Sequence, residues 1–237
     1  MSSILEIGSY DVNGSLRVSK PPTANWTGLD FEEGPGVDLV VKPGNQLPFE
    51  DKAFDLVLAS SVFEHDLEFW RTIRELARVS KPNGFIYLNA PSNGPFHRFP
   101  VDGFRFYPDA SIAFLNLIRE LHPDAELVES FISDQSPGEP WNDFVAIYAL
   151  SPGSIRPKTR LSETANCRNV WLEAVFQEET LTAETQDSEK LQNLQGQVRQ
   201  LEEKLAKVET SVSWRITQPL RSAANVLKLQ IFSRAKK

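Results

Sequence analysis

From residue 3 to about residue 150, short runs of strand-forming residues alternate with amphipathic or loop segments. This alternation is typical of βαβ units around a mostly parallel sheet. Two runs, VDLVV and FDLVLAS, are almost continuously apolar, as central strands covered on both faces are. The pattern predicts an α/β, doubly wound fold. Its expected strands are Ile4–Gly8, Trp26–Asp30, Val37–Val41, Phe54–Ser60, Phe85–Ala90, Glu126–Ile132 and Phe144–Leu150.

Two stretches between these strands carry further signals. Apolar residues recur at helical spacing over residues 66–80, with Asp66 as the expected N-cap and residues 81–84 (KPNG) as the stop. Residues 91–110 are rich in proline, glycine and aromatic residues and show no clean period. An irregular segment after a strand is where a doubly wound sheet builds its ligand pocket.

After the expected sheet, residues 151–186 begin as a linker (SPGSIRP). A helix is expected over Asn166–Glu179, with its apolar residues on one face. These apolar residues are Val170, Trp171, Ala174 and Val175.

From Leu191 to Val212, apolar residues are separated by alternating steps of three and four, which is the a/d pattern of three heptads. The stripe is narrower than that of a helix packed on a globular body, so self-association through a coiled coil is favoured over that alternative. The chain therefore divides into a body (1–150), a linker with a helix (151–186), a coiled coil (187–213) and a basic C-terminal helix or tail (214–237).

Charge separates the tail from the rest. The 237 residues carry a net charge of -7, yet residues 215–237 hold six basic and no acidic side chains. The acidic remainder argues against nucleic-acid binding, which needs clustered Lys and Arg. One cysteine and three histidines without zinc-ligand spacing give no reason to expect a metal. The absence of a leader-like start or of a long apolar run favours a cytoplasmic protein.

The stretch LEIGSYDVNGS, at residues 5–15, ends the first expected strand. Gly8 allows a sharp turn beneath a ligand, and Asp30, at the end of the second strand, is placed to accept hydrogen bonds from ribose hydroxyls. A pyrophosphate needs bare backbone beside it, and Tyr10 occupies that space. A ligand with adenine and ribose but no phosphate fits better, and S-adenosylmethionine is such a ligand.

Four segments then stand in register: LEIGSYDVNGS, WTGLD, LPFEDKAFDLVLASSVFEH and ARVSKPNGFIYLNAPS. Together they resemble the class I, Rossmann-like S-adenosylmethionine-dependent methyltransferases of the methyltransferase type 11 kind, over residues 3 to about 150. The resemblance implies a seven-stranded sheet that ends in an antiparallel hairpin. It also implies a cofactor site made of Glu6, Gly8, Ser9, Tyr10, Asp30, Asn45, Gln46, Leu47, Ser60 and Ser61.

Methyl transfer to a hydroxyl needs an aligned acceptor and a base. His65 and His97 are the candidate bases, since histidine titrates near neutrality; the alternative is that His65 caps or braces its helix. In the segment HRFPVDGFRFYPDA, Asp102, Arg105 and Tyr107 are polar groups among aromatic residues, which suits a sugar-like acceptor. The plainer alternative is a lid over the edge of the sheet.

Members of this fold usually carry helices before the first strand that close over the cofactor, and here three residues precede it. The pocket is therefore expected to be open, or to be covered by residues 151–186 or by another subunit. The segment SVSWRITQPLRSAANVLK resembles one that follows coiled coils in bacterial proteins of surface-polysaccharide assembly. Such a basic tail suits the inner face of the cytoplasmic membrane or a partner protein.

Three functions follow, in order of preference. The first is a methyltransferase acting on a hydroxyl of a sugar or glycan intermediate in bacterial surface-polysaccharide biosynthesis. The second is a non-catalytic, methyltransferase-like scaffold for a polysaccharide-assembly complex. The third, a nicotinamide-dependent oxidoreductase, is disfavoured by Tyr10.

Overall fold

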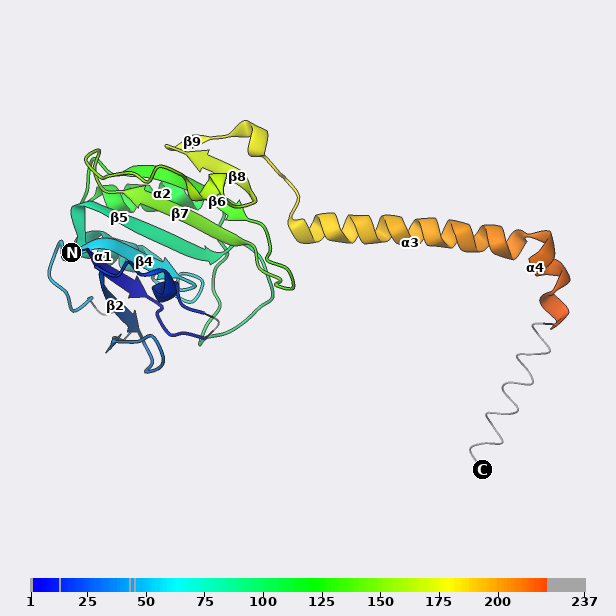
Figure 1. Ribbon diagram of the computed structural model, residues 1–237, viewed down its shortest axis with the longest axis horizontal. Coiled ribbons are helices and arrows are strands. Elements are labelled where there is room, and N and C mark those ends of the chain that lie inside the picture. Colours follow the sequence, from blue (N-terminus) through cyan, green and yellow to red (C-terminus); the bar gives the residue numbers. More distant parts are fainter. Residues whose placement is uncertain (1, 13, 43, 45, 221–237) are drawn as a thin grey trace, which may run out of the picture. The chain divides into compact units, whose positions relative to one another are not determined.

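The computed structural model describes residues 2–12, 14–42, 44 and 46–220. Its contacts divide the chain into two units, Met1–Ala183 and Glu184–Lys237. The first unit is built around a β-sheet and the second is helical (Figure 1). Most of the basic tail expected over 214–237 lies outside the described residues.

Nine strands of the described residues form one sheet, in the order β3-β2-β1-β4-β5-β7-β6-β8-β9 (Figure 1). The first five strands run parallel, whereas β7 is antiparallel to both of its neighbours, β5 and β6. All seven expected strands are present, and two more follow. Their bounds are β1 Ser3–Ile7, β2 Asn25–Asp30, β3 Leu39–Val40, β4 Phe54–Ser60, β5 Ser80–Pro91, β6 Glu126–Ser133, β7 Asp143–Ala149, β8 Cys167–Leu172 and β9 Val175–Phe176.

The two added strands show that the helix expected over residues 166–179 is wrong. Glu173 and Ala174 have φ angles of 52° and 62°, so they form the tight turn that joins β8 to β9. Val170 of β8 is buried in a cluster with Phe131 of β6. Of the apolar residues that suggested a helical face, Val170 and Trp171 pack on opposite sides of β8, which pairs with β6, whereas Ala174 lies in the turn and Val175 in β9. Short 3-10 turns, η2 (Leu161–Glu163) and η3 (Glu178–Thr180), flank this hairpin.

The α-helices of the first unit are α1 (Phe69–Val79) and α2 (Ala110–Arg119). Both pack into the same hydrophobic core, where Ile73 and Leu76 of α1 are fully buried against β1, β4 and β5. On the opposite face a smaller cluster joins Ile4 and Leu58 to Ala24, which precedes β2, and the link from β1 to β2 holds the 3-10 turn η1 (Leu16–Ser19). The described α-helices therefore cover one face of the sheet, and the doubly wound arrangement is not realised.

The start of α1 also differs from the expected cap. Glu68 occupies the N-cap position, but its side chain bonds to Arg71 and makes no capping hydrogen bond. Asp66 lies two residues earlier, where it accepts hydrogen bonds from the Glu68 amide and the Thr72 hydroxyl. Asp66 thus holds the first turn from outside the helix.

The second unit consists of α3 (Gln186–Thr210) and α4 (Val212–Ile216) in its described part. The Thr185 hydroxyl caps α3 by accepting a hydrogen bond from the Ser188 amide. The apolar heptad residues from Leu191 to Val212 are all exposed, by 49–72%. No helix of the described residues is long and apolar enough to cross a bilayer.

The burial of Val170 in the β8–β9 hairpin can be tested by substitution. Val170 is 5% exposed, whereas Val175, in the partner strand, is 61% exposed. We expect Val170→Ala to lower the free energy of unfolding by about 2 kcal/mol, because two buried methyl groups are lost and a cavity remains. Val175→Ala, the matched control, should change it by less than about 0.5 kcal/mol in urea unfolding. Equal effects would contradict the observed burial.

Candidate functional site

The turn after β1 is built on Gly8, whose φ is +75°. Its amide donates a hydrogen bond to the Leu29 carbonyl at 2.9 Å, so the turn is tied to β2. A Cβ at this position would lie 2.3 Å from Cγ2 of Val62, in the segment after β4. Only glycine therefore allows the turn after β1 and the turn after β4 to meet.

Asp30 ends β2 directly beside this turn and is 6% exposed. Its Oδ2 accepts a hydrogen bond from the Tyr10 amide at 3.1 Å, and its Oδ1 accepts one from the Phe31 amide at 2.7 Å. Because each carboxylate oxygen has two lone pairs, Oδ2 retains one for a ligand hydroxyl. The buried Ser9 hydroxyl has no hydrogen-bond partner among the described residues, so the turn holds an unused polar group. These features fit the adenosine-type ligand expected from the sequence.

Glu6 braces the sheet. Its Oε2 accepts a hydrogen bond from Trp26 Nε1 at 2.9 Å, which joins β1 to β2. The side chain is 3% exposed, and burial raises the pKa of its carboxyl group. Because the Glu6 carboxyl group is buried and already bonded to Trp26, it affects the site by holding β1 in place.

The segment proposed for adenine lies against α1. Asn45 is outside the described residues, and Gln46 is exposed. The Leu47 amide donates to Glu75 Oε2 of α1 at 2.9 Å and is thereby committed to the fold. At the end of β4, Ser60 leads into Ser61, which has a φ of 54° and whose amide donates to the Asn89 carbonyl of β5 at 3.0 Å.

Three side chains from two loops meet beyond this turn: Glu64 and His65 after β4, and His97 after β5. Each offers one donor atom, and the three atoms lie within 4.8 Å of one another. His65 Nε2 is 3.6 Å from Glu64 Oε1, and the two imidazole rings are edge to face at 4.9 Å. The structure therefore brings both candidate bases together.

Glu64 is the most buried member of this Glu64–His65–His97 cluster. It is 1% exposed, and its Oε2 has no hydrogen-bond partner among the described residues. Burial raises the pKa of the carboxyl group to about 7. Burial also lowers the pKa of His65, whose Nδ1 is 2.5 Å from the Val101 carbonyl. That contact assigns the proton to Nδ1 and leaves Nε2 with a free lone pair.

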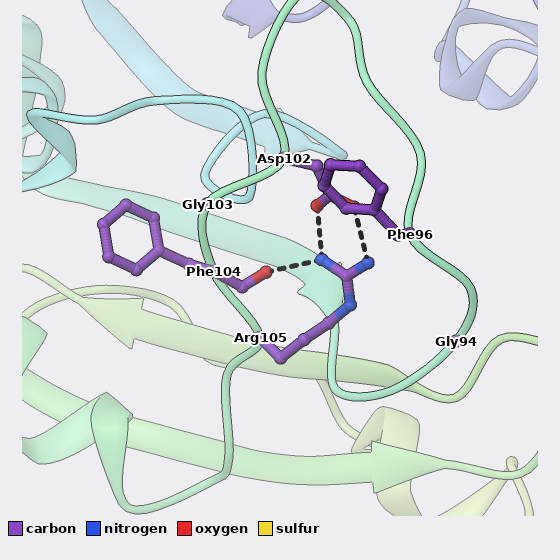
Figure 2. Close-up of a pocket in the computed structure, with 6 residues that line it drawn as sticks. All are labelled: Gly94, Phe96, Asp102, Gly103, Phe104 and Arg105. Atoms are coloured by element: carbon purple, nitrogen blue, oxygen red, sulfur yellow. Dashed lines mark hydrogen bonds and ion pairs between the residues drawn. The ribbon is translucent and has the colours of Figure 1, made fainter.

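Asp102 and Arg105 bind each other. Figure 2 shows their paired contacts, Nη1 to Oδ1 at 2.5 Å and Nη2 to Oδ2 at 2.9 Å, beside a hollow of about 310 Å³. The guanidinium holds the pKa of Asp102 well below its usual range. The hollow is lined by Gly94, Phe96, Asp102, Gly103, Phe104 and Arg105.

The role expected for the polar residues of this loop thus needs refinement. Asp102 and Arg105 fix the shape of the hollow, and Asp102 also accepts a hydrogen bond from the His97 amide at 2.7 Å. Tyr107, proposed as a third polar group, is 56% exposed and does not line the hollow. The exposed aromatic ring at its rim belongs to Phe96.

Two residues of this region were not selected as site residues from the sequence. Glu64 lies inside the quoted motif, next to His65, but nothing in the sequence shows that it is buried. Trp141 carries no local signal. Its ring lies 4.7 Å from that of His97, and a Cβ on Gly94 would meet it at 2.1 Å. A close approach between segments about 45 residues apart is visible only in the fold.

Residues 151–186 were one candidate cover for the cofactor pocket, and their hairpin cannot provide it. β8 and β9 lie at the far edge of the sheet from β1 and β2, with β4, β5, β7 and β6 between them. The loops after β2 and β5 meet near the site instead. Phe31 and Phe99 lie 5.5 Å apart, and the Asp11 amide donates to the Pro35 carbonyl at 2.8 Å.

Comparisons with known proteins agree with this geometry. Residues 16–88 match the family model described as "Methyltransferase domain". A phthiotriol/phenolphthiotriol dimycocerosates methyltransferase of Mycobacterium ulcerans is 36% identical over 86 residues, which are 30% of this chain and 31% of that protein. An uncharacterized methyltransferase of Mycobacterium tuberculosis is 36% identical over 69 residues, or 29% and 27% of the two chains. The chain thus spans about a third of the length of the curated relatives it matches.

The fold has a solved counterpart. It resembles a Burkholderia thailandensis 1,6-didemethyltoxoflavin-N1-methyltransferase, solved with its substrate and S-adenosylhomocysteine, with a TM-score of 0.50 and 16% identity over 63% of this chain and 71% of that one. Residues 16–88 are therefore similar to a methyltransferase domain, and the described α/β fold resembles that of a solved methyltransferase.

The buried Glu6 gives a pH prediction. Because its folded pKa is raised above the ordinary value of 4.5, the folded protein binds more protons there than the unfolded chain. Its contribution to the free energy of unfolding should therefore decline as pH rises from 4.5 through the folded pKa. Glu6→Gln keeps an acceptor for Trp26 without a charge, so it should exceed wild type in stability at pH 8 and match it at pH 4.

Urea unfolding at the two pH values, without added ligand, measures this difference. Glu33→Gln is the matched control, since Glu33 is exposed and should show no such dependence. A Glu6→Gln protein that is less stable than wild type at pH 8 would contradict the assignment.

Proposed function

We propose that this protein is an S-adenosylmethionine-dependent methyltransferase that methylates a hydroxyl group of a sugar or glycan intermediate in bacterial surface-polysaccharide biosynthesis. One observation carries the proposal. The Gly8 turn, Asp30 and the Glu64–His65–His97 cluster follow the carboxyl ends of three adjacent parallel strands, β1, β2 and β4, with His97 on the loop after β5. That edge of a parallel sheet is where such folds bind ligands.

The residues of the first turn would hold the cofactor. Asp30 Oδ2 would accept a hydrogen bond from a ribose hydroxyl, the Gly8 turn sets the path of the backbone beside it, and Ser9 would supply a hydroxyl that has no partner among the described residues. When bound, S-adenosylmethionine supplies an electrophilic methyl group on a sulfonium. The Glu64–His65–His97 cluster would take up the proton of the acceptor hydroxyl, so that the acceptor oxygen could bond to that methyl group while the sulfur keeps the electron pair of the broken bond.

The hollow beside the cluster supports a polyhydroxylated acceptor. Phe96 and Phe104 line it with aromatic surface, and the Asp102–Arg105 pair adds fixed polar groups at its wall (Figure 2). Apolar surface with a few placed polar groups is typical of small-molecule sites. The mycobacterial relatives are named for phthiotriol and phenolphthiotriol dimycocerosates, which are different acceptors. A glycan remains our proposal for this chain.

A second candidate is the non-catalytic scaffold. It is favoured by Asp30, whose carboxylate already accepts hydrogen bonds from three backbone amides. Incubation with radiolabelled S-adenosylmethionine and fractionated bacterial glycolipids separates the two candidates. Label transferred to a glycan supports the enzyme, whereas cofactor binding without any labelled product supports the scaffold.

Cofactor binding is tested by titration calorimetry. We expect wild type to bind S-adenosylmethionine, and Asp30→Ala to weaken binding at least tenfold, because a buried charge-assisted hydrogen bond to ribose is lost. Asp30→Asn keeps one acceptor oxygen for the neighbouring amides and controls for misfolding. Asp51 lies before the amino end of β4, and its side chain is 70% exposed. Asp51→Ala should therefore bind as wild type does. No binding by wild type at millimolar cofactor would refute the proposal.

The second unit is proposed to join two copies of the chain through a parallel coiled coil. With Leu191, Val198, Leu205 and Val212 at a positions, Lys204 falls at g and Glu209 at the following e. In a parallel pair these two residues of opposite charge face each other, whereas an antiparallel pair centred on Leu201 sets Glu202 against its own copy. An exposed helix of this length also needs a partner to be stable in water. The same unit would bring the basic tail to a membrane surface or an assembly partner.

Light scattering after gel filtration tests the association. We expect wild type at twice the 26.7 kDa chain mass and the double variant Leu201→Asp, Leu205→Asp at the chain mass, because charge in the seam is desolvated on pairing. Glu203→Ala, on the outer side of α3, is the control and should remain dimeric. A monomeric wild type at micromolar concentration would exclude the proposal.

A further inference from the structure

We propose that Glu64, His65 and His97 form a binding site for one divalent transition-metal ion of the zinc type. Their three donor atoms lie within 4.8 Å of one another, although His97 is more than 30 residues from the other two. Two imidazoles and one carboxylate are a donor set that zinc uses in catalytic sites, where further positions stay open. Magnesium and calcium prefer oxygen donors alone and are poorer candidates.

The fold, and not the ion alone, brings the donors together. The Gly103 amide donates to the Glu64 carbonyl at 2.7 Å, and the Val101 carbonyl contacts His65 Nδ1 at 2.5 Å. The loop that carries His97 is thus fastened at two points to the turn that carries Glu64 and His65. The donors therefore sit near one another before any ion arrives.

Glu64 supplies the independent observation. Its carboxylate is 1% exposed, yet Oε2 has no hydrogen-bond partner among the described residues. The Arg105 guanidinium makes its paired hydrogen bonds to Asp102. A buried carboxylate without a paired cation is costly. A metal ion at the cluster would supply the missing positive charge.

The His65 imidazole makes the outer hydrogen bond that is typical of a metal ligand. Donation from His65 Nδ1 to Val101 leaves Nε2 free, 3.6 Å from Glu64 Oε1. His97 Nδ1 is buried 3.3 Å from Asp102 Oδ2 but makes no hydrogen bond among the described residues, and the Asp102 carboxylate is held by Arg105. Donors on a tetrahedral zinc ion are separated by roughly 3.3 Å. The distance from Glu64 Oε1 to His65 Nε2, 3.6 Å, is close to that value. The His97 side chain is 37% exposed and has room to move toward the other two donors.

The ion would give the cluster a specific task, which rests on the methyl transfer proposed above. Three protein donors leave a coordination position for an acceptor hydroxyl, and the ion lowers the pKa of a hydroxyl bound there. The proton is then released to water, and the oxygen keeps the electron pair that forms the bond to the methyl group. Histidine would act as a ligand in this scheme and not as the base.

The test is zinc binding by the full chain after treatment with a chelator. Titration calorimetry with zinc chloride and elemental analysis should give about one ion per chain. His65→Ala, His97→Ala and Glu64→Gln should each weaken binding about 100-fold, and cobalt(II) should give a visible absorption band that these variants lose. Magnesium chloride should bind at least tenfold more weakly than zinc. The variants are compared by circular dichroism to confirm that they fold, and Glu64→Gln keeps the buried volume.

Controls and outcomes separate this proposal from the function above. His122→Gln and Cys167→Ser alter the remaining histidine and the one cysteine, and both should bind zinc as wild type does. Asp30→Ala should lose the cofactor and keep zinc, whereas His97→Ala should lose zinc and keep the cofactor. Fewer than 0.2 zinc ions per chain, or equal binding by wild type and His97→Ala, would overturn the metal site even if methyl transfer were found.

Discussion

The turn after β4 is the contact on which the rest of the site depends. Ser61 holds a left-handed conformation and donates to Asn89 of β5, which places Val62 directly against Gly8. Two residues later, Glu64 is carried into the interior and its carbonyl accepts a hydrogen bond from the loop after β5. One short segment therefore joins the cofactor turn, the fifth strand and the acceptor loop. A residue larger than glycine at position 8 would separate these parts, because the clash falls on the Val62 side chain and the Ser60 backbone.

The sheet explains how such a contact arises. β1, β2, β4 and β5 are parallel, so their carboxyl ends share one edge, and each loop that leaves that edge meets its neighbours there. The helices α1 and α2 lie on one face and bury the core residues beneath. The loops at this edge carry polar groups and also aromatic residues that pack into the core, such as Phe63 after β4 and Phe106 after β5. Asp30, Glu64 and His97 therefore all follow the carboxyl ends of parallel strands at this edge of the sheet.

The sequence predicted the parts whose physics is local. All seven strands of the body were predicted correctly from their apolar runs, and the turn at Gly8 was predicted because a tight turn restricts the residue type. The contact between Asp30 and a ribose stays a prediction. The helix over 166–179 was wrong because Val170, Trp171 and Val175 fit a helix face and a hairpin equally well, and the free edge of β6 decided between them. The proposed metal donors could not be predicted from the sequence, for a related reason. Zinc spacing is sought along the chain, whereas Glu64 and His97 become neighbours through the fold.

Two buried carboxyl groups in this region have pKa values shifted in opposite directions, and the difference follows from one arginine. Asp102 and Glu64 are each about 1% exposed, and burial alone would favour protonation of both. Arg105 bonds to Asp102 through both of its terminal nitrogens, so the pKa of Asp102 falls and its charge is stable. Glu64 receives no such partner, and its pKa rises to about 7. Pairs of acids whose environments push their pKa values apart are typical of functional sites. Glu64, beside the two histidines, is therefore the buried carboxyl group that has no cationic partner. The chemistry of the site thus depends on the pairing of Arg105 with Asp102 as much as on the residues around the acceptor.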